Sequence, residues 1–155
     1  TPCVRNPRGL LLCAVAHLCE GDEARARELE RDADRIGGVG YDSYLSGPRL
    51  RLALERGDRA AADRLLDLPV ERGFVWGAGA MAARIDALVG FGRLERIEEE
   101  VRAFLDEGLV LEPFALRALG AARRDDELLA RADERFAALG LEWHRAQTER
   151  LLGSL

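Results

Sequence analysis

Apolar residues recur along this chain at helical spacing, in segments that are separated by short turns. The clearest stripe is Leu94, Ile97, Val101 and Phe104, whose spacings of three and four residues place the side chains on one face of a helix. Similar stripes precede and follow each turn, so the pattern predicts an all-α fold. The turns themselves are short and polar: Glu20-Gly21-Asp22, Arg56-Gly57-Asp58, Phe91-Gly92-Arg93 and Arg123-Arg124-Asp125.

The central residues of these turns are 36, 35 and 32 residues apart (21 to 57, 57 to 92, 92 to 124). Two helices of about three to four turns, with their connections, use this length of chain, which is the period of helical-hairpin repeat proteins. We therefore predict one tetratricopeptide-like domain over residues 1–155, an α–α superhelix. Its four hairpins are expected at about 8–38, 42–68, 78–107 and 112–140. A capping helix at 141–152 should cover the open end, with Trp143, Ala146 and Leu151 inward.

Prolines complicate the starts of two helices. Residues 1–7 have two prolines and no periodicity, so the first helix should begin near Arg8. Pro48 removes a backbone donor, so the first helix of the second hairpin should either kink at this residue or begin there, with Ser46 or Gly47 as its cap.

The first helix is apolar on nearly every side between Leu10 and Leu18. Such a helix is normally covered on all sides, and a preceding repeat could cover it if the chain, which starts at a threonine, is a segment of a longer protein. Without that repeat, one face should lack a partner, and large exposed apolar faces usually mark interfaces. We expect either that residues 1–7 fold over this helix or that it forms a homodimer contact through Leu11 and Val15.

Composition narrows the classes of function. All 23 basic residues are arginine and none is lysine, which excludes a P-loop, a lysine Schiff base and a catalytic Lys–Glu pair. Arginines alternate with acidic residues along the helices, and the pI is about 5.2, so binding of nucleic acid by this segment is disfavoured. No apolar run approaches the roughly 20 residues that cross a bilayer. We expect a cytoplasmic protein that does not contact membranes.

Candidate chemistry is sparse. Cys13 and His17 lie four residues apart, as two metal ligands on a helix could, but Cys19 would lie about 160° around the helix from His17. A buried cysteine and a hydrogen-bonded histidine are therefore the preferred interpretation.

Other polar residues fit structural roles. His144, next to Trp143, could act as a base, but no recognisable nucleophile motif accompanies it. The hydroxyl side chains are interpreted as caps or solvent-facing groups: Ser43, Ser46, Thr148 and Ser154. The glycine run at 37–40 is interpreted as a helix stop. We predict no catalytic residue, no metal site and no cofactor.

Binding residues can be proposed from the repeat register. Arg49 and Arg84 each lie eight residues before a turn glycine, so they occupy equivalent positions on the first helices of neighbouring hairpins. Two such arginines could hold an acidic or C-terminal carboxylate group of a partner, although solvated or locally salt-bridged arginines are the preferred alternative. Trp76 could anchor a partner or fill the gap between hairpins. A ligand pocket formed with aromatic neighbours is a further alternative: Tyr41, Tyr44, Phe74 and Trp76.

Four stretches also carry a family resemblance: 5–16 (Arg-Asn-Pro-Arg-Gly-Leu-Leu-Leu-Cys-Ala-Val-Ala) with the turn at 20–22, 48–58, 112–120 (Glu-Pro-Phe-Ala-Leu-Arg-Ala-Leu-Gly) and 136–148. They resemble the C-terminal helical-repeat region of large bacterial signalling proteins. In those proteins a class III adenylate/guanylate cyclase or transcriptional-regulator domain is joined to an AAA-type ATPase and tetratricopeptide-like repeats. The resemblance implies a sensor or regulatory scaffold. The cyclase signatures and the P-loop are absent here, so any nucleotide chemistry would lie outside this chain.

These observations favour a non-enzymatic protein–protein interaction module of a bacterial signalling protein. Its partner would be a protein, a peptide or a neighbouring domain of the parent chain, bound by the first helices of the hairpins. The alternatives are a ligand-sensing helical domain, or part of a cyclase or ATPase whose catalytic domains lie elsewhere. A groove lined by mixed polar residues would support the first interpretation, and a closed pocket with converging titratable groups would support the others.

Overall fold

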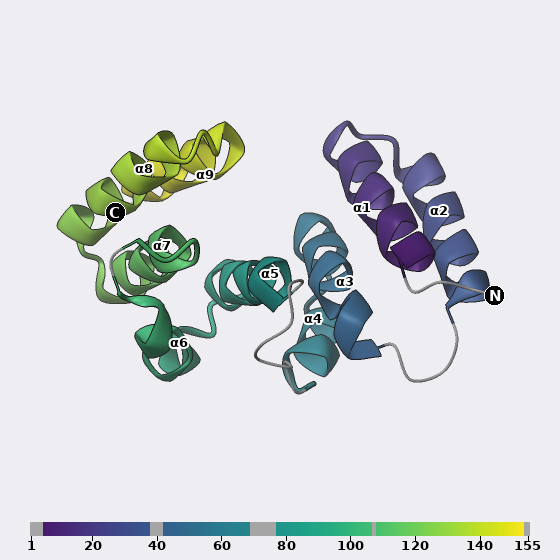
Figure 1. Cartoon of the computed structure of the whole chain (residues 1–155), viewed down its shortest axis with the longest axis horizontal. Helices are drawn as coiled ribbons and strands as arrows, with labels where there is room; N and C mark the ends of the chain where they lie inside the picture. The colour runs from purple at the N-terminus through teal and green to yellow at the C-terminus, as the bar shows by residue number, and fades with distance from the viewer. Residues whose placement is uncertain (1–4, 38–41, 69–76, 107, 154–155) are drawn as a thin grey trace. The chain divides into compact units, whose positions relative to one another are not determined.

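The computed structural model describes residues 5–37, 42–68, 77–106 and 108–153 (Figure 1). These residues form α-helices and one short 3-10 helix, and no strand occurs among them, which confirms the all-α class. The elements are α1 (Arg5–Cys19), α2 (Glu23–Ile36), α3 (Asp42–Arg56), α4 (Arg59–Leu66), α5 (Gly77–Gly90), α6 (Leu94–Val101), η1 (Arg102–Phe104), α7 (Glu112–Arg123), α8 (Asp126–Ala138) and α9 (Glu142–Leu152).

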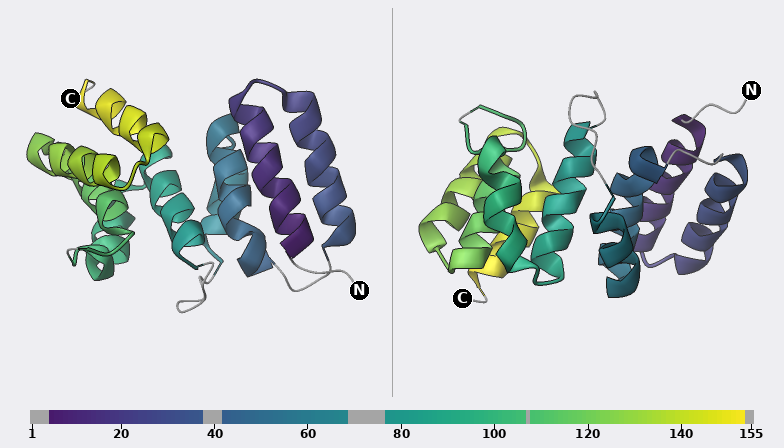
Figure 2. Two further views of the ribbon diagram at one scale, coloured as in Figure 1. Left: turned by 45° about the horizontal axis from the view of Figure 1, so that its top comes forward. Right: turned by 90° about the horizontal axis from the view of Figure 1, so that it is seen from below.

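The helices belong to two compact units, Thr1–Ala87 and Leu88–Leu155, and the boundary falls within α5. In the first unit α1 pairs with α2 as a hairpin, α3 packs against α1, and α4 folds back on α3 (Figures 1 and 2). In the second unit α7 packs against α6 and α8, and α9 packs against α8. The core of the first unit is built mostly from leucine and alanine: Leu11, Ala14, Ala26, Leu29, Ala33, Leu45 and Leu52.

The four predicted turns share one backbone geometry. Their central residues all have positive φ: Gly21 (+85°), Gly57 (+66°), Gly92 (+68°) and Arg124 (+54°). In each turn the following N–H bonds to the carbonyl five residues earlier, at 2.8 to 2.9 Å: Asp22 to His17, Asp58 to Ala53, Arg93 to Leu88, and Asp125 to Gly120. These are the bonds of the Schellman motif, which satisfies the last carbonyls of a helix.

The residue that completes each turn also begins the next helix. The carboxylates of Asp22, Asp58 and Asp125 accept hydrogen bonds of 2.9 to 3.1 Å from backbone N–H groups in the first turns of α2, α4 and α8. Arg93, at the equivalent position before α6, makes no side-chain cap. One short motif therefore ends one helix and starts its partner, which explains why the turns are so regular in sequence.

Arg124 occupies a backbone conformation that favours glycine, with φ at +54°. We expect Arg124→Gly to raise the free energy of unfolding by about 0.5–1 kcal/mol, because the strain of an L-residue there is roughly 1–2 kcal/mol and the added freedom of glycine in the unfolded chain offsets part of it. Urea denaturation measures the change. The control Arg123→Gly replaces the last residue of α7 and removes its hydrogen bonds to Glu98, so it should instead lower stability by about 1 kcal/mol. A destabilised Arg124→Gly variant would contradict this account.

Of the two alternatives for Pro48, a helix start at this residue is not what the structure shows, because α3 runs from Asp42 to Arg56 with Pro48 inside it. Pro48 cannot donate to the carbonyl of Tyr44, four residues earlier. That carbonyl instead accepts a hydrogen bond of 3.0 Å from Nη1 of Arg8 on α1. The proline is tolerated because a side chain from a neighbouring helix replaces the missing donor. The start of α1 also differs from the prediction, since it begins at Arg5 and includes Pro7.

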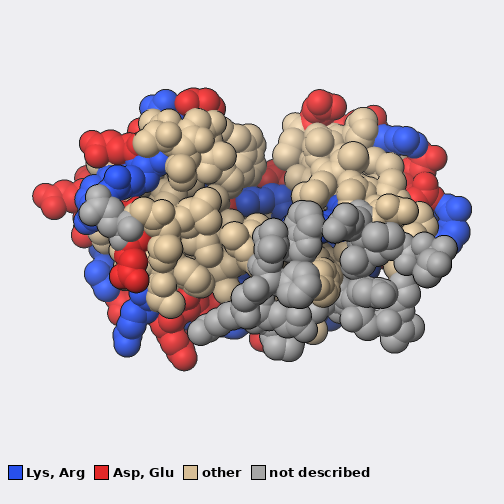
Figure 3. All heavy atoms as spheres, viewed as in Figure 1, with Lys and Arg blue, Asp and Glu red and all other residues tan. Residues whose placement is uncertain are grey.

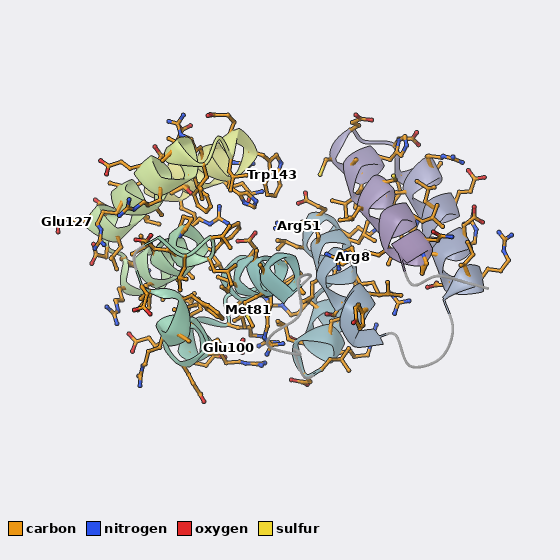
Figure 4. The ribbon with its side chains drawn as sticks, in the orientation of Figure 1. Arg8, Arg51, Met81, Glu100, Glu127 and Trp143 are labelled. Carbon is orange, nitrogen blue, oxygen red and sulfur yellow. The ribbon has the colours of Figure 1, made fainter. Side chains whose placement is uncertain are left out.

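Within the first unit α5 approaches α3 closely. A Cβ atom added to Gly47 would lie 2.9 Å from the Cα of Ala80, so this crossing requires glycine. Further along the same two helices, the guanidinium of Arg51 (Figure 4) forms an ion pair with Asp86, and both side chains are largely buried. The two helices are therefore joined by a small-residue contact and by a buried ion pair.

Candidate functional site

A pocket of about 530 Å³ opens between α2, α3 and α4 in the first unit. We call it the α2–α4 groove. Its apolar lining comes from α1, α3 and the α4 segment: Leu11, Leu52, Ala53, Ala61, Leu65 and Leu68. Its charged lining consists of Glu30, Asp34, Arg49, Arg56, Asp58 and Arg64. The volume lies within the range of about 300–1,000 Å³ that is typical of ligand sites.

Helices α2 and α4 line the groove with different kinds of side chain. α2 contributes Glu30 and Asp34, and α4 contributes Ala61, Arg64 and Leu65. Leu52 and Ala53 at the base are at most 4% exposed. The apolar surface that the groove presents to a ligand therefore comes from the partly exposed residues of the α4 side, Ala61, Leu65 and Leu68.

Ion pairs between α2 and α3 form one wall of the groove. Arg56 Nη1 lies 2.9 Å from Glu30 Oε2, and a second guanidinium nitrogen also bonds this carboxylate. Arg56 Nε lies 3.1 Å from Glu23 Oε1. The hydrogen bonds to Glu30, followed by its charge and by the bonds to Glu23, raise the pKa of Arg56. Nearby, Arg49 Nη2 lies 2.8 Å from Asp34 Oδ1. This wall is therefore charged but largely self-compensated.

The opposite wall, formed by α4, has a different balance of charge. Asp58 is occupied as the N-cap of α4, where its Oδ1 accepts a 2.9 Å hydrogen bond from the N–H of Ala61. Arg64 is exposed, and it makes no ion pair with any residue in the described parts of the chain. The α4 wall therefore offers a cation to a partner, whereas the α2 wall does not.

The structure places the predicted binding residues differently. Arg49 lines the groove, but Arg84 is buried at 8% exposure on α5 and does not line it. The groove also lies between α2 and α4, the second helices of their hairpins, whereas the first helices were the expected contact surface. Trp76 lies outside the described residues, as do Tyr41 and Phe74 of the alternative aromatic pocket. The remaining member, Tyr44, is half-buried on α3.

The two residues proposed for a homodimer contact lie against the core. Leu11 is 1% exposed, and Val15 is half-buried against the same core cluster. The exposed side of α1 instead carries Leu12, Cys13, Ala16 and Cys19, with Leu12 at 50% exposure. A contact of α1 with a second chain would therefore involve Leu12 and its neighbours in place of Leu11. The periodicity could not distinguish these faces, because both are apolar.

His17 and the two cysteines of α1 lie at least partly at the surface. His17 Nδ1 lies 3.9 Å from Glu20 and 3.8 Å from Asp22, and Cys13 and Cys19 are free and exposed, so the expected burial of the cysteine was wrong. Partial desolvation of the thiol, followed by the charge of Glu55, raises the pKa of Cys19, which makes it a poorer nucleophile at neutral pH. Within the described ranges no cluster of three potential metal ligands occurs.

His144 belongs to an aromatic cluster in the second unit. Its ring stacks on Phe136 at 5.3 Å between centroids and meets Phe114 edge-on at 4.7 Å. The buried guanidinium of Arg117 lies 4.8 Å from the Phe136 centroid, and its Nη1 donates to the carbonyl of His144 at 3.0 Å. These contacts attach α9 to α7 and α8, so they indicate a packing role for His144.

The predicted inward face of α9 was wrong for Trp143 and Ala146, whereas Leu151, the third residue of that prediction, is half-buried. Trp143 and Ala146 are exposed, and Trp143 projects from the surface of α9 (Figure 4). Thr148 is fully buried instead, and its hydroxyl donates to the carbonyl of His144 at 2.9 Å. A search for apolar residues misses this face because its members are His144 and Thr148. Their spacing of four residues is the signal that could have revealed it.

Among the helices that the structure describes, none has the length and apolar character needed to span a membrane. Arginine and acidic side chains are intermingled on the face drawn in Figure 3, in agreement with their alternation in the sequence. Comparison of the chain with models of protein families, with curated proteins and with solved structures gives no match.

Proposed function

We propose that this chain is a non-enzymatic interaction module that holds a segment of another protein in the α2–α4 groove. The observation that carries the proposal is the groove itself, a pocket of about 530 Å³ with a leucine floor and charged walls, built from four helices of one unit. Because the groove is accessible to solvent and lined by apolar side chains, its occupation by an apolar partner would be favourable by about 25 cal/mol per Å² of apolar surface that leaves water.

The repeated turns support the further proposal of a tetratricopeptide-like superhelix. Schellman bonds and a positive φ occur at these four turns, with spacings of 36, 35 and 32 residues, and once more at Gly140, before the last helix. Repetition of a helical hairpin is how such arrays build extended binding surfaces. We propose that the module acts as a regulatory scaffold in a cytoplasmic signalling protein, with any nucleotide chemistry in other parts of the parent chain.

Substitution of Ala61 tests the assignment of the groove. Ala61 lines the groove, whereas the preceding Ala60 is exposed on α4 and does not line it. We expect Ala61→Trp to fill the groove and to weaken binding of an apolar partner by at least about tenfold, and we expect Ala60→Trp to leave binding unchanged. Helical peptides selected by phage display against the wild-type chain serve as ligands, and fluorescence anisotropy measures their affinity for all three proteins.

The control for this experiment is the fold of each variant, checked by circular dichroism and by thermal unfolding. Peptides that bind the two tryptophan variants as tightly as the wild type would contradict the proposed site. Failure to select any peptide that binds the wild-type chain would also count against the proposed function.

A further inference from the structure

The chemistry of the groove walls restricts the form of its occupant. An extended peptide usually gains affinity from backbone hydrogen bonds to the edge of a sheet, and polyproline segments dock in grooves lined by aromatic rings. The described parts of the chain contain no strand, and none of the described residues that line the groove is aromatic. Most backbone groups of α2, α3 and α4 are used within their helices, so the groove offers mainly side chains. An occupant must then satisfy its own backbone groups, as a helix does.

The apolar floor fits one stripe of such a helix. Leu52 and Ala53 form the base, and Leu65 and Leu68 continue it along the α4 side. Two helices flank this floor, which is the geometry in which an amphipathic helix lays residues at i, i+3, i+4 and i+7 into a hydrophobic groove. We therefore expect binding to depend more on the helical spacing of the partner's apolar residues than on which apolar residues they are.

The charges around the floor favour one sign of charge on the partner residues that lie beside the apolar stripe of its helix. On the α2 wall, Glu30 is paired with Arg56 and Asp34 with Arg49. On the α4 wall, Arg64 is exposed and has no ion pair within the described ranges. The whole chain carries a net charge of −5, but at physiological ionic strength charges beyond about 8 Å are screened. A docked helix therefore meets mainly the charges of the lining, where, among the described residues, Arg49 and Arg56 are paired with carboxylates of α2 and Arg64 is not.

We propose that the occupant of the α2–α4 groove is an amphipathic helix of a partner protein with acidic residues beside its apolar stripe, placed to pair with Arg64. This inference rests on the proposed function and deepens it. The partly exposed Leu65 and Leu68 on the α4 side would supply the apolar contact, and Arg64 would supply the preference for a negatively charged flank.

Two designed peptides of about 15 residues, long enough to form helices, test the proposal. Both carry leucine at i, i+3, i+4 and i+7, and they differ only in flanking glutamate or lysine. We expect the wild-type chain to bind the glutamate peptide about five- to tenfold more tightly, because one exposed ion pair is gained and one repulsion is avoided. Arg64→Glu should reverse this preference, and the reversal should weaken as salt is added.

Arg59→Glu is the matched control, because Arg59 is also an exposed arginine of α4 but does not line the groove. This variant should keep the wild-type preference. If both peptides bind the wild-type chain equally and neither binds Ala61→Trp, the groove is a binding site but the proposed preference for an acidic partner is wrong. Absence of binding by either peptide would overturn both proposals. Self-association of the chain that Ala61→Trp abolishes would identify a second copy as the occupant and overturn the inference.

Discussion

Replacement of Phe136 by alanine should lower the free energy of unfolding of the second unit by about 3–5 kcal/mol, the usual effect of truncating a buried phenylalanine. Phe136 is fully buried. Its ring contacts Phe114 edge-on at 5.0 Å, stacks on His144, and lies under the guanidinium of Arg117. The substitution therefore removes apolar burial, two ring contacts and a cation–π contact at once.

The loss should reach α9 as well as α8, because His144 of α9 rests on the Phe136 ring. Chemical denaturation followed by circular dichroism measures the stability, and the NMR signals of α9 report its detachment. Leu139→Ala is the control, since Leu139 is 48% exposed near the end of α8 and its truncation should cost less than about 1 kcal/mol. Similar losses in the two variants would contradict the assigned core.

Replacement of Asp86 by alanine should destabilise the first unit by about 3 kcal/mol. Asp86 is 3% exposed at its side chain and is paired with Arg51, which is 13% exposed. Removing one member of a buried pair leaves a desolvated charge, which typically costs 3–5 kcal/mol. The lower end applies here because the Arg51 side chain is 13% exposed and so is not fully removed from water.

The double variant Arg51→Met/Asp86→Leu separates the two possible causes. Because it removes both charges and fills the space with apolar atoms, we expect its stability to lie within about 1 kcal/mol of the wild type. Urea denaturation of the full chain provides the comparison. A double variant as unstable as Asp86→Ala would show that shape, and not the buried charge, determines the cost.

The turns could be predicted from sequence because their signals are local. Gly21, Gly57 and Gly92 supply positive φ, and the following position is an aspartate or an arginine that starts the next helix. Whether α3 continues without a break at Pro48 could not be decided in this way. Its continuation through Pro48 depends on Arg8, which lies 36 residues away from the carbonyl that it binds. No local sequence pattern predicts a contact between residues so far apart in the chain.

The candidate site was only partly accessible to sequence reasoning. The repeat register placed Arg49 at a binding position, and this residue does line the groove. The register could not show that Arg84, at the equivalent position, is buried. It also could not show that Ala53 and Ala61, on different helices, leave space between them. A pocket forms where neighbouring side chains leave space unfilled, and the periodic pattern of apolar residues in the sequence does not report such space.

The most direct measurement for the central claim is two-dimensional ¹H–¹⁵N NMR of the full chain, titrated with the glutamate-flanked helical peptide. The account predicts that shift changes cluster on groove residues of α2, α3 and α4, including Ala53, Ala61 and Leu65, and that Ala61→Trp abolishes them. Shift changes confined to helices of the second unit, or a spectrum that the peptide leaves unchanged, would contradict the assignment of the α2–α4 groove as the binding site.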